Sequence, residues 1–280
     1  MKHRGIVGLL ALVFGFAFLY IPILSMVFFS FNNSRLVTVW DAAHSPTLKW
    51  YVELIHDTQI LDAAGLSIRI AAMTATGAAI LGTVAGLVLA RFGPFRGRTL
   101  LSGMTTAPLV MPEVISGLSM LLLFVALEQA IGWPKGRGIV TITIAHITFA
   151  MSYVTVIVQS RLAGFDDSLE EAAMDLGARP AKIFFRITLP LILPAIVSGW
   201  LLAFTLSWDD VVISQFVAGP GSSTLPMVIF SKVRLGVSPN VNALATIMVL
   251  LVTVMVISSA AWMRRQESRR AKELRQAAGS

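Results

Sequence analysis

Long apolar runs separated by short polar segments make up most of this chain. Six runs are long enough to cross a hydrocarbon core, which needs about 20 helical residues. They are residues 5–31, 63–90, 99–127, 139–160, 191–216 and 241–263. The pattern therefore predicts an all-α polytopic membrane protein with six transmembrane helices.

Composition strengthens this prediction and removes several alternatives. Hydrophobic residues make up 56% of the chain and charged residues 13%, and the mean hydropathy is +0.78. That is too little polar surface for a soluble domain. The formal charge of +7 is scattered at the ends of apolar runs, which indicates membrane topology rather than nucleic-acid binding. The chain has no Cys, so disulfides, thiolate nucleophiles and Cys-ligated zinc are excluded.

Lys and Arg are unevenly divided between the two sets of loops. Of these basic residues, fifteen lie in one set of loops and six lie in the other set. Arg69 is the one that lies inside an apolar run. The excess predicts that both termini and residues 165–194 are cytoplasmic. We expect the stem of Arg69 to reach the outer interface. The first run follows basic residues, as in a signal peptide, but its length predicts a retained helix.

Residues 165–194 form the longest polar interruption on the cytoplasmic side, and they read as two short helices. Ser168 suits a helix start, and Glu171 completes a capping box with it. Gly177 suits a left-handed helix end, and Pro180 suits the first turn of the next helix. Helical spacing places a small apolar stripe on one side, which predicts a docking surface. The stripe consists of Leu169, Ala172, Ala173 and Leu176.

The third run is interrupted by Pro108 and Pro112, with Glu113 directly after. Proline disturbs a helix, and irregular backbone at membrane depth needs surrounding protein or a water-filled cavity. Glu113 therefore either lines a pathway or lies in water beside a kink near the interface.

The fifth run contains Trp208, Asp209 and Asp210 after Ser207. Adjacent carboxylates on a helix point about 100° apart, so we expect them to do different jobs. Burying one in lipid costs about 2.5–3.5 kcal/mol on insertion scales, which favours a partner such as a cationic substrate. The alternatives are an ion pair with Arg69 or Lys232, or a helix end at the outer interface.

Two further patterns indicate packing rather than chemistry. Small residues recur every fourth position at Ala78, Gly82, Gly86 and Ala90, which suits close helix approach within one chain or in a dimer. Trp40, Trp50 and Tyr51 lie in the first long loop and suit an interfacial anchor.

Motifs for nucleotides and metals are missing from the sequence. The segment Gly219-Pro220-Gly221 lacks the Lys-Ser/Thr of a phosphate loop. The four histidines, His3, His44, His56 and His146, have no metal-ligand spacing. We therefore expect neither a cofactor nor a catalytic site in this chain.

One motif in residues 165–194 resembles a known family. Glu171-Ala172-Ala173, Gly177, Ile187 and Leu189-Pro190 reproduce the E-A-A, G, I-x-L-P signature of permeases from binding-protein-dependent (type I) ABC importers. Residues 32–40, 205–227 and 238–246 are similar to polyamine permeases, and among these to second permease subunits of putrescine importers. The likeness covers nearly the whole chain.

The resemblance implies a division of labour among several subunits. This chain would pair with a homologous permease, two ATPase subunits that bind ATP and Mg, and a periplasmic polyamine-binding protein, in a bacterial inner membrane. Residues 1–62 would form the first helix and a periplasmic loop, 63–263 the permease core with a coupling loop at 165–190, and 264–280 a basic cytoplasmic tail.

Site residues follow from the same resemblance and from the charges above. ATPase coupling is assigned to Ser168, Leu169, Glu171, Ala172, Ala173, Leu176, Gly177 and Pro190. The substrate pathway is assigned to Glu113, Trp208, Asp209 and Asp210. The alternatives are a permease of this family for another cationic or small solute, an ion-coupled carrier or channel, and a membrane scaffold or enzyme.

Overall fold

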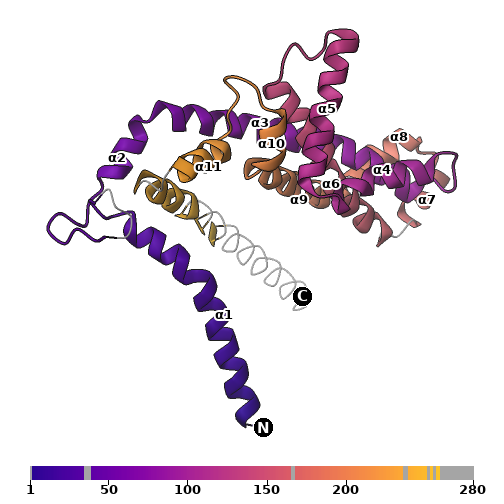
Figure 1. Cartoon of the computed structure of the whole chain (residues 1–280). Coiled ribbons are helices and arrows are strands. Elements are labelled where there is room, and N and C mark those ends of the chain that lie inside the picture. Colours follow the sequence, from indigo (N-terminus) through magenta and orange to yellow (C-terminus); the bar gives the residue numbers. More distant parts are fainter. Residues whose placement is uncertain are drawn as a thin grey trace. The chain divides into compact units, whose positions relative to one another are not determined.

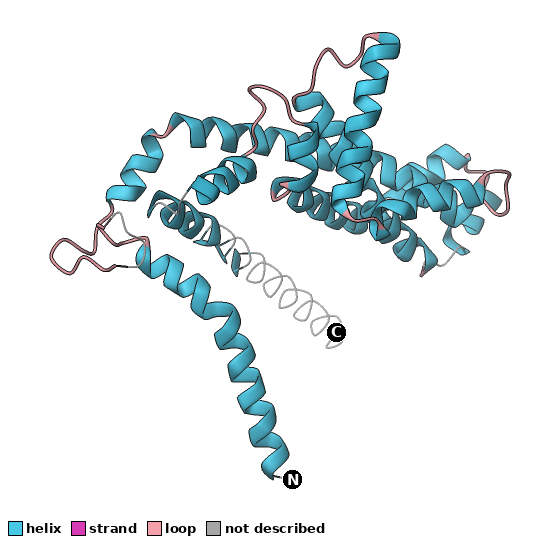
Figure 2. Ribbon diagram, in the orientation of Figure 1, coloured by secondary structure: helices cyan, strands magenta, loops and turns pink. Residues whose placement is uncertain are grey.

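A computed structural model describes residues 2–34, 39–164, 168–235, 239–250, 253–254 and 257–258. Within these ranges the chain is helical and contains no strand (Figures 1 and 2). It divides into two compact units, Gln59–Phe230 and the remainder, Met1–Thr58 with Ser231–Ser280.

The helices are α1 (Lys2–Phe29), α2 (Lys49–His56), α3 (Thr58–Arg91), α4 (Arg98–Val110), α5 (Glu113–Ile131), α6 (Ile139–Ala163), α7 (Ser168–Asp175), α8 (Pro180–Ile183), η1 (Phe184–Thr188), α9 (Leu189–Trp208), α10 (Val212–Val217) and α11 (Leu225–Leu235).

Five described helices are long and apolar enough to cross a membrane. They are Gly8–Phe29, Thr58–Arg91, Glu113–Ile131, Ile139–Ala163 and Pro180–Trp208. A shorter apolar helix, Pro239–Leu250, covers the start of the sixth predicted run. Most of that run's remainder and the basic tail, residues 264–280, lie outside the described residues. The all-α prediction is confirmed for the part of the chain that the structure describes.

Two predicted spans have the wrong boundaries. The run at residues 99–127 is two helices, since α4 ends at Val110 and α5 begins at Glu113. Pro112 takes the cap position of α5, and Pro108 stays inside α4. The run at 191–216 begins earlier, at Pro180, and ends at Trp208.

The early start of the fifth span has a local cause. A separate short helix was expected after Gly177, but α8 continues through η1, a π-helical turn, into α9. Pro190 has no N–H to donate to a carbonyl four residues back, and its ring crowds that carbonyl. One wide π turn directly before Pro190 relieves this conflict without ending the helix.

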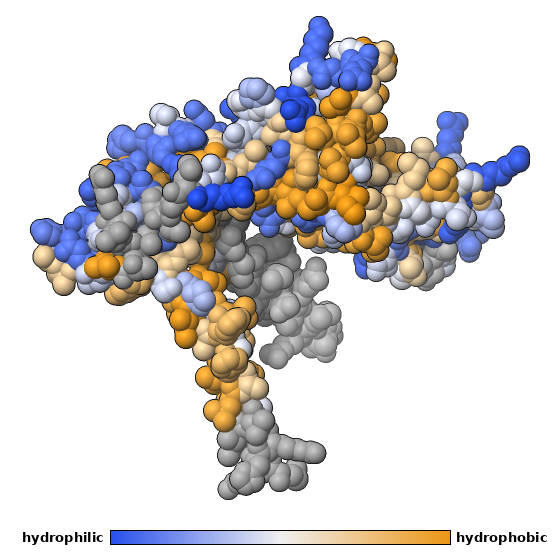
Figure 3. All heavy atoms as spheres, in the orientation of Figure 1, coloured by the Kyte–Doolittle hydropathy of each residue, from blue (hydrophilic) through white to orange (hydrophobic). Residues whose placement is uncertain are grey.

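Helix α1 presents apolar side chains around its circumference from Gly8 onward. Its 18-residue apolar window has no buried residue inside the unit. In Figure 3 the described part of α1 is almost continuously orange. A helix that is apolar all round must face lipid or another protein, because water would not solvate it.

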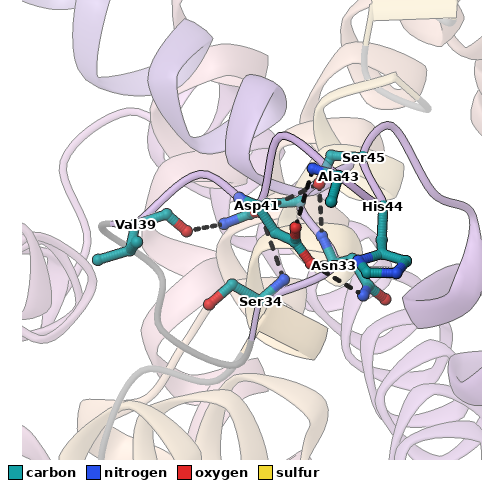
Figure 4. A network of polar contacts seen from close by, with 8 residues as sticks. Asn33, Ser34, Val39, Asp41, Ala43, His44 and Ser45 are labelled. Carbon is teal, nitrogen blue, oxygen red and sulfur yellow. Dashed lines mark hydrogen bonds and ion pairs between the residues drawn. The ribbon is translucent and has the colours of Figure 1, made fainter.

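The loop after α1 is organised around Asn32, which is 1% exposed. Its Oδ1 accepts a hydrogen bond from the Asp41 N–H at 2.9 Å, and its Nδ2 donates to the Val39 carbonyl at 2.7 Å. Asp41 in turn accepts from Asn33 at 3.3 Å, which lowers the pKa of the Asp41 carboxyl (Figure 4). Trp50 is buried and donates to the Asn32 carbonyl at 2.6 Å, so the prediction of Trp50 as an interfacial anchor is wrong.

In the unit Gln59–Phe230, α3 packs closely against α6 through small residues. A Cβ placed on Gly82 would lie 2.6 Å from Val154 Cβ and 2.8 Å from the Met151 carbonyl oxygen. A Cβ on Gly86 would lie 3.0 Å from Val158 Cβ. The predicted small-residue packing therefore serves contact within this chain.

Two buried apolar clusters hold this unit together. One joins α3, α6 and α9 and consists of Ala75, Ala78, Ala150, Val154, Val158, Leu162, Ile192 and Ala203. The other joins α3, α5, α6 and α10 and consists of Ile70, Phe124, Ile142, Ala145, Ile213 and Val217. Helix α6 contributes to both clusters, so it is the central element of the unit.

Candidate functional site

Helix α7 ends at Gly177 in the manner that the sequence predicts. Gly177 has a φ of +78°, a left-handed conformation that glycine adopts without strain. The Ala178 N–H donates to the Ala173 carbonyl at 3.0 Å, and the Gly177 N–H donates to Met174 at 2.8 Å. These two bonds form a Schellman motif, which satisfies carbonyls at the helix end. Pro180 then begins α8, as predicted.

The predicted coupling residues lie on an exposed helix. No residue of α7 is buried, and the side chain of Leu176, directly after it, is 89% exposed. Leu169 is 52% exposed, while Glu171 and Ala172 are also exposed and Ala173 is half-buried. Ser168 is the first residue of α7, and the residue before it, where a cap belongs, lies outside the described residues.

Glu170 connects α7 to the rest of its unit. Glu170 Oε1 accepts a hydrogen bond from Thr188 Oγ1 at 2.6 Å and lies 3.5 Å from Arg91 Nη2. Arg91 ends α3, and Thr188 ends η1. A cavity of about 350 Å³ lies beside these contacts, with Met174 on its α7 side. Sequence reasoning singled out Glu171 and missed Glu170, which lies off the apolar stripe.

The helix is interrupted between α9 and α10, at Asp209 to Val211, and we call this interruption the break between α9 and α10. Asp210 Oδ2 accepts from the Ser214 N–H at 2.7 Å, and Oδ1 accepts from the Ile213 N–H at 3.2 Å. These are first-turn N–H groups of α10, which have no partner within the helix. The Asp210 side chain therefore caps α10 from two positions before its first residue.

His146 of α6 holds the same carboxylate from the other side. Its Nε2 lies 3.1 Å from Asp210 Oδ2, and its Nδ1 lies 2.7 Å from Ser207 Oγ. The exposed fractions of the two side chains are 2% for His146 and 8% for Asp210. An ionised carboxylate can only accept hydrogen bonds, so we assign the proton of the His146 ring to Nε2, where it is donated to Asp210. The Ser207 hydroxyl then donates to the unprotonated Nδ1. The Ser214 hydroxyl lies 3.2 Å from Nε2.

This pair removes one alternative that the sequence left open, an ion pair of Asp210 with Arg69 or Lys232. Asp210 pairs with His146 rather than with Arg69 or Lys232. Lys232 pairs with Asp57 at 2.7 Å, within the other unit. His146 escaped sequence reasoning because it was tested only for metal spacing. The useful signal was that His146 and Asp210 both interrupt apolar runs, where each is costly unless paired.

Asp209 has a different environment from Asp210. It closes α9 with its N–H donating to the Thr205 carbonyl at 3.2 Å, and the residue is exposed. Trp208, half-buried, stacks on Phe204 with ring centroids 6.1 Å apart. Phe204 stacks on Trp200 at 5.5 Å. Asp209 thus follows directly after a column of aromatic rings, and an exposed carboxylate and aromatic faces are the groups that suit an alkylammonium ion.

Glu113 lies apart from this arrangement. It is exposed and begins α5, where a negative charge interacts favourably with the helix dipole. Among the described residues, no hydrogen bond or ion pair joins Glu113 to Asp209 or Asp210. Arg69 lines a separate polar pocket of about 610 Å³ with Asp62 and Gln59. No group of three or more potential metal ligands occurs in the described ranges.

Comparisons with known proteins give a consistent result. Residues 82–272 match the model of a family described as "Binding-protein-dependent transport system inner membrane component". The chain is 57% identical over 268 residues to the putrescine transport system permease protein PotI of Escherichia coli K12, covering 95% of this chain and 94% of the relative. It is 44% identical over 244 residues to the spermidine/putrescine permease PotC of the same organism, covering 87% and 89%.

Solved structures support the fold alone. A bacterial ABC transporter that imports the polysaccharide alginate aligns with a TM-score of 0.70 and 17% identity, covering 93% of this chain and 96% of that chain. The MetNI methionine ABC transporter aligns with a TM-score of 0.58 and 16% identity, covering 72% and 92%.

Proposed function

The chain belongs to the family of binding-protein-dependent transport system inner membrane components, and we propose that it is a permease subunit of an ATP-driven polyamine importer. The observation that carries the proposal is the 57% identity to a putrescine permease over 95% of this chain. The exposed Asp209 and the aromatic column beside it suit a diamine and support the same substrate class. Putrescine and spermidine are the proposed substrates.

The chain has no nucleotide-binding motif, so ATP and Mg would be bound and hydrolysed by two partner ATPase subunits. Helix α7 and the following turn would dock on those subunits with both termini on the same, cytoplasmic side. Exposed apolar side chains such as Leu169 and Leu176 support this role, because a partner would shield them from water. A homologous permease and a periplasmic polyamine-binding protein would complete the complex.

Polyamines would cross along acidic and aromatic side chains. A diamine that loses its hydration needs carboxylates and aromatic faces in exchange. Glu113, Trp208 and Asp209 are the proposed substrate contacts in this chain, and Asp210 is proposed to support this part of the pathway. Capture would be the task of the binding protein, so contacts along the pathway need only be weak enough to release the substrate.

Co-purification followed by transport tests this function. The tagged chain, expressed with its neighbouring subunits, should bring down an ATPase and a second permease. Reconstituted vesicles should take up radiolabelled putrescine only with ATP and binding protein, and excess spermidine should compete while excess lysine should not. Uptake without ATP would instead indicate a channel or carrier. ATP-driven uptake of another cation but no polyamine would indicate a different solute within the same family.

A further inference from the structure

We propose that the two adjacent carboxylates have separate tasks: Asp209 contacts an ammonium group of the substrate, whereas His146 and Asp210 are positioning residues that hold Asp209 in place. This inference rests on the proposed function and assigns roles within its pathway.

The acceptor positions of Asp210 are already occupied. Its Oδ2 accepts from the Ser214 N–H at 2.7 Å and faces His146 Nε2 at 3.1 Å, while Oδ1 accepts from the Ile213 N–H. Its side chain is 8% exposed. A passing ammonium group would have to displace a helix-capping bond and a buried histidine. Such a displacement would leave donors unsatisfied in an apolar interior, which is costly.

His146 connects three helices through one ring. It belongs to α6, reaches α9 through Ser207 Oγ at 2.7 Å, and reaches the start of α10 through Asp210 and Ser214. Both ring nitrogens have partners, so the ring has one favoured orientation. Ser207 and Ser214 are buried as well. The ring therefore fixes where α9 ends and where α10 begins.

Asp209 depends on this arrangement because it is the neighbour of Asp210 and the last hydrogen-bonded residue of α9. Its exposure beside Trp208 exists only while the chain leaves the helix at this point. If Asp210 were released, α9 could extend by one residue or more. Because only Asp209 to Val211 join α9 to α10, such an extension would move the start of α10 and change the surroundings of the Asp209 side chain.

Thiol labelling of the assembled complex tests the positioning role. The chain has no Cys, so Asp209→Cys supplies its only thiol. We expect a trimethylammonium-bearing methanethiosulfonate reagent to label this site, and putrescine to slow the labelling. Adding His146→Ala should change the labelling rate about fivefold or more and lower the melting temperature of the complex. His146→Gln retains a donor for Asp210, so it should restore part of the labelling rate and part of the melting temperature.

Transport assays separate the two carboxylates. Per assembled complex, Asp209→Asn should reduce putrescine uptake about tenfold with an unchanged melting temperature, because only a surface charge is lost. Asp210→Asn should lower the melting temperature together with uptake. The melting-temperature loss of His146→Ala combined with Asp210→Asn should be smaller than the sum of the two single losses, because both substitutions break the contact between His146 and Asp210. His56→Ala is the matched control, because the His56 ring is exposed and its hydrogen bond is with the Val52 carbonyl one turn back, and it should change neither uptake nor the melting temperature.

Several results would overturn the proposal. An Asp209→Cys complex that stays unlabelled would show that this position does not face the pathway. If adding His146→Ala to the Asp209→Cys complex changed neither the labelling rate nor the melting temperature, His146 would not be a positioning residue. If Asp210→Asn kept the full melting temperature but reduced putrescine uptake as much as Asp209→Asn does, Asp210 would be the residue that contacts the substrate. A complex that imports no polyamine contradicts the proposed function instead, while the labelling rates and melting temperatures still decide the role of His146.

Discussion

Helix α7 and the break between α9 and α10 are built in opposite ways. The α7 side chains predicted to act are exposed or half-buried, its end turns on a left-handed glycine, and Glu170 joins it to α3 through an ion pair. At the break, Asp210, His146, Ser207 and Ser214 are buried or nearly so and bonded to one another. An exposed helix with few anchors is suited to being moved by a partner. A buried polar cluster is suited to preserving one geometry.

The energies of the two kinds of contact differ accordingly. A largely exposed ion pair contributes about 0–1 kcal/mol, whereas losing a buried hydrogen bond to a charged group costs about 1.5–3 kcal/mol. Arg91 and Glu170 are about one-fifth exposed, with side-chain values of 22% and 20%. Both side chains are mostly covered, but the Arg91 Nη2 to Glu170 Oε1 distance is long at 3.5 Å, so we expect this contact to contribute an energy between these two values. The comparison predicts that α7 substitutions impair coupling, while substitutions at the break impair stability and substrate contact.

The largest effect in α7 should come from Gly177→Leu. A leucine at φ +78° costs about 1–2 kcal/mol, although space around the site is open. We expect the complex to assemble but to lose about tenfold in putrescine imported per ATP hydrolysed, measured in vesicles. Gly177→Asn is the matched control, because asparagine tolerates this conformation. Normal uptake and normal ATPase rates in Gly177→Leu would show that this turn does not transmit movement.

A smaller effect is expected for Glu170→Gln. Glutamine keeps an acceptor for Thr188 but removes the charge facing Arg91, a loss of about 1 kcal/mol. Uptake per ATP should fall about two- to fivefold. The melting temperature of the complex should be almost unchanged. Asp175→Asn, an exposed change at the end of the same helix, should have no effect. If Glu170→Gln lowered the melting temperature as much as His146→Ala does, the two regions would not differ in the way proposed here.

The smallest effect is expected for Glu113→Gln. Glu113 is exposed, so its neutralisation should leave assembly intact and reduce putrescine uptake about twofold, by weakening attraction for a cation. Raising the salt concentration should reduce wild-type uptake toward the variant's rate. A defect larger than that of Asp209→Asn would place the main substrate contact at the break between α4 and α5.

Features encoded in nearby residues could be predicted from the sequence. Hydropathy located the long helices, and Gly177 followed by Pro180 located the end of α7 and the start of α8, because these residues restrict their own backbone. Hydropathy placed the start of the fifth run too late, at residue 191. The helix begins at Pro180 and continues through one π turn, Phe184–Thr188, to Trp208.

Contacts between distant residues were the part that sequence could not supply. His146 and Asp210 are 64 positions apart, and Arg91 and Glu170 are 79 apart. No local propensity relates such residues. The first pair forms where α6 meets the segment between α9 and α10, and the second where the end of α3 meets α7. The expectation that the two adjacent carboxylates do different jobs stays a prediction. Their environments differ because α9 ends between Trp208 and Asp210, and not because of a 100° spacing within one continuous helix. Which one is buried depends on the fold.

The glycines of α3 have a mechanical consequence. Because Gly82 admits no side chain against Val154 and the Met151 carbonyl, α3 and α6 cannot slide past each other by a residue without collision. Arg91 on α3 and His146 on α6 therefore belong to one stiff block. We expect a displacement of Glu170 to move α3 and α6 together, because α3 packs along α6 from the turn near Arg91 to Gly77, which lies against Ile147 beside His146.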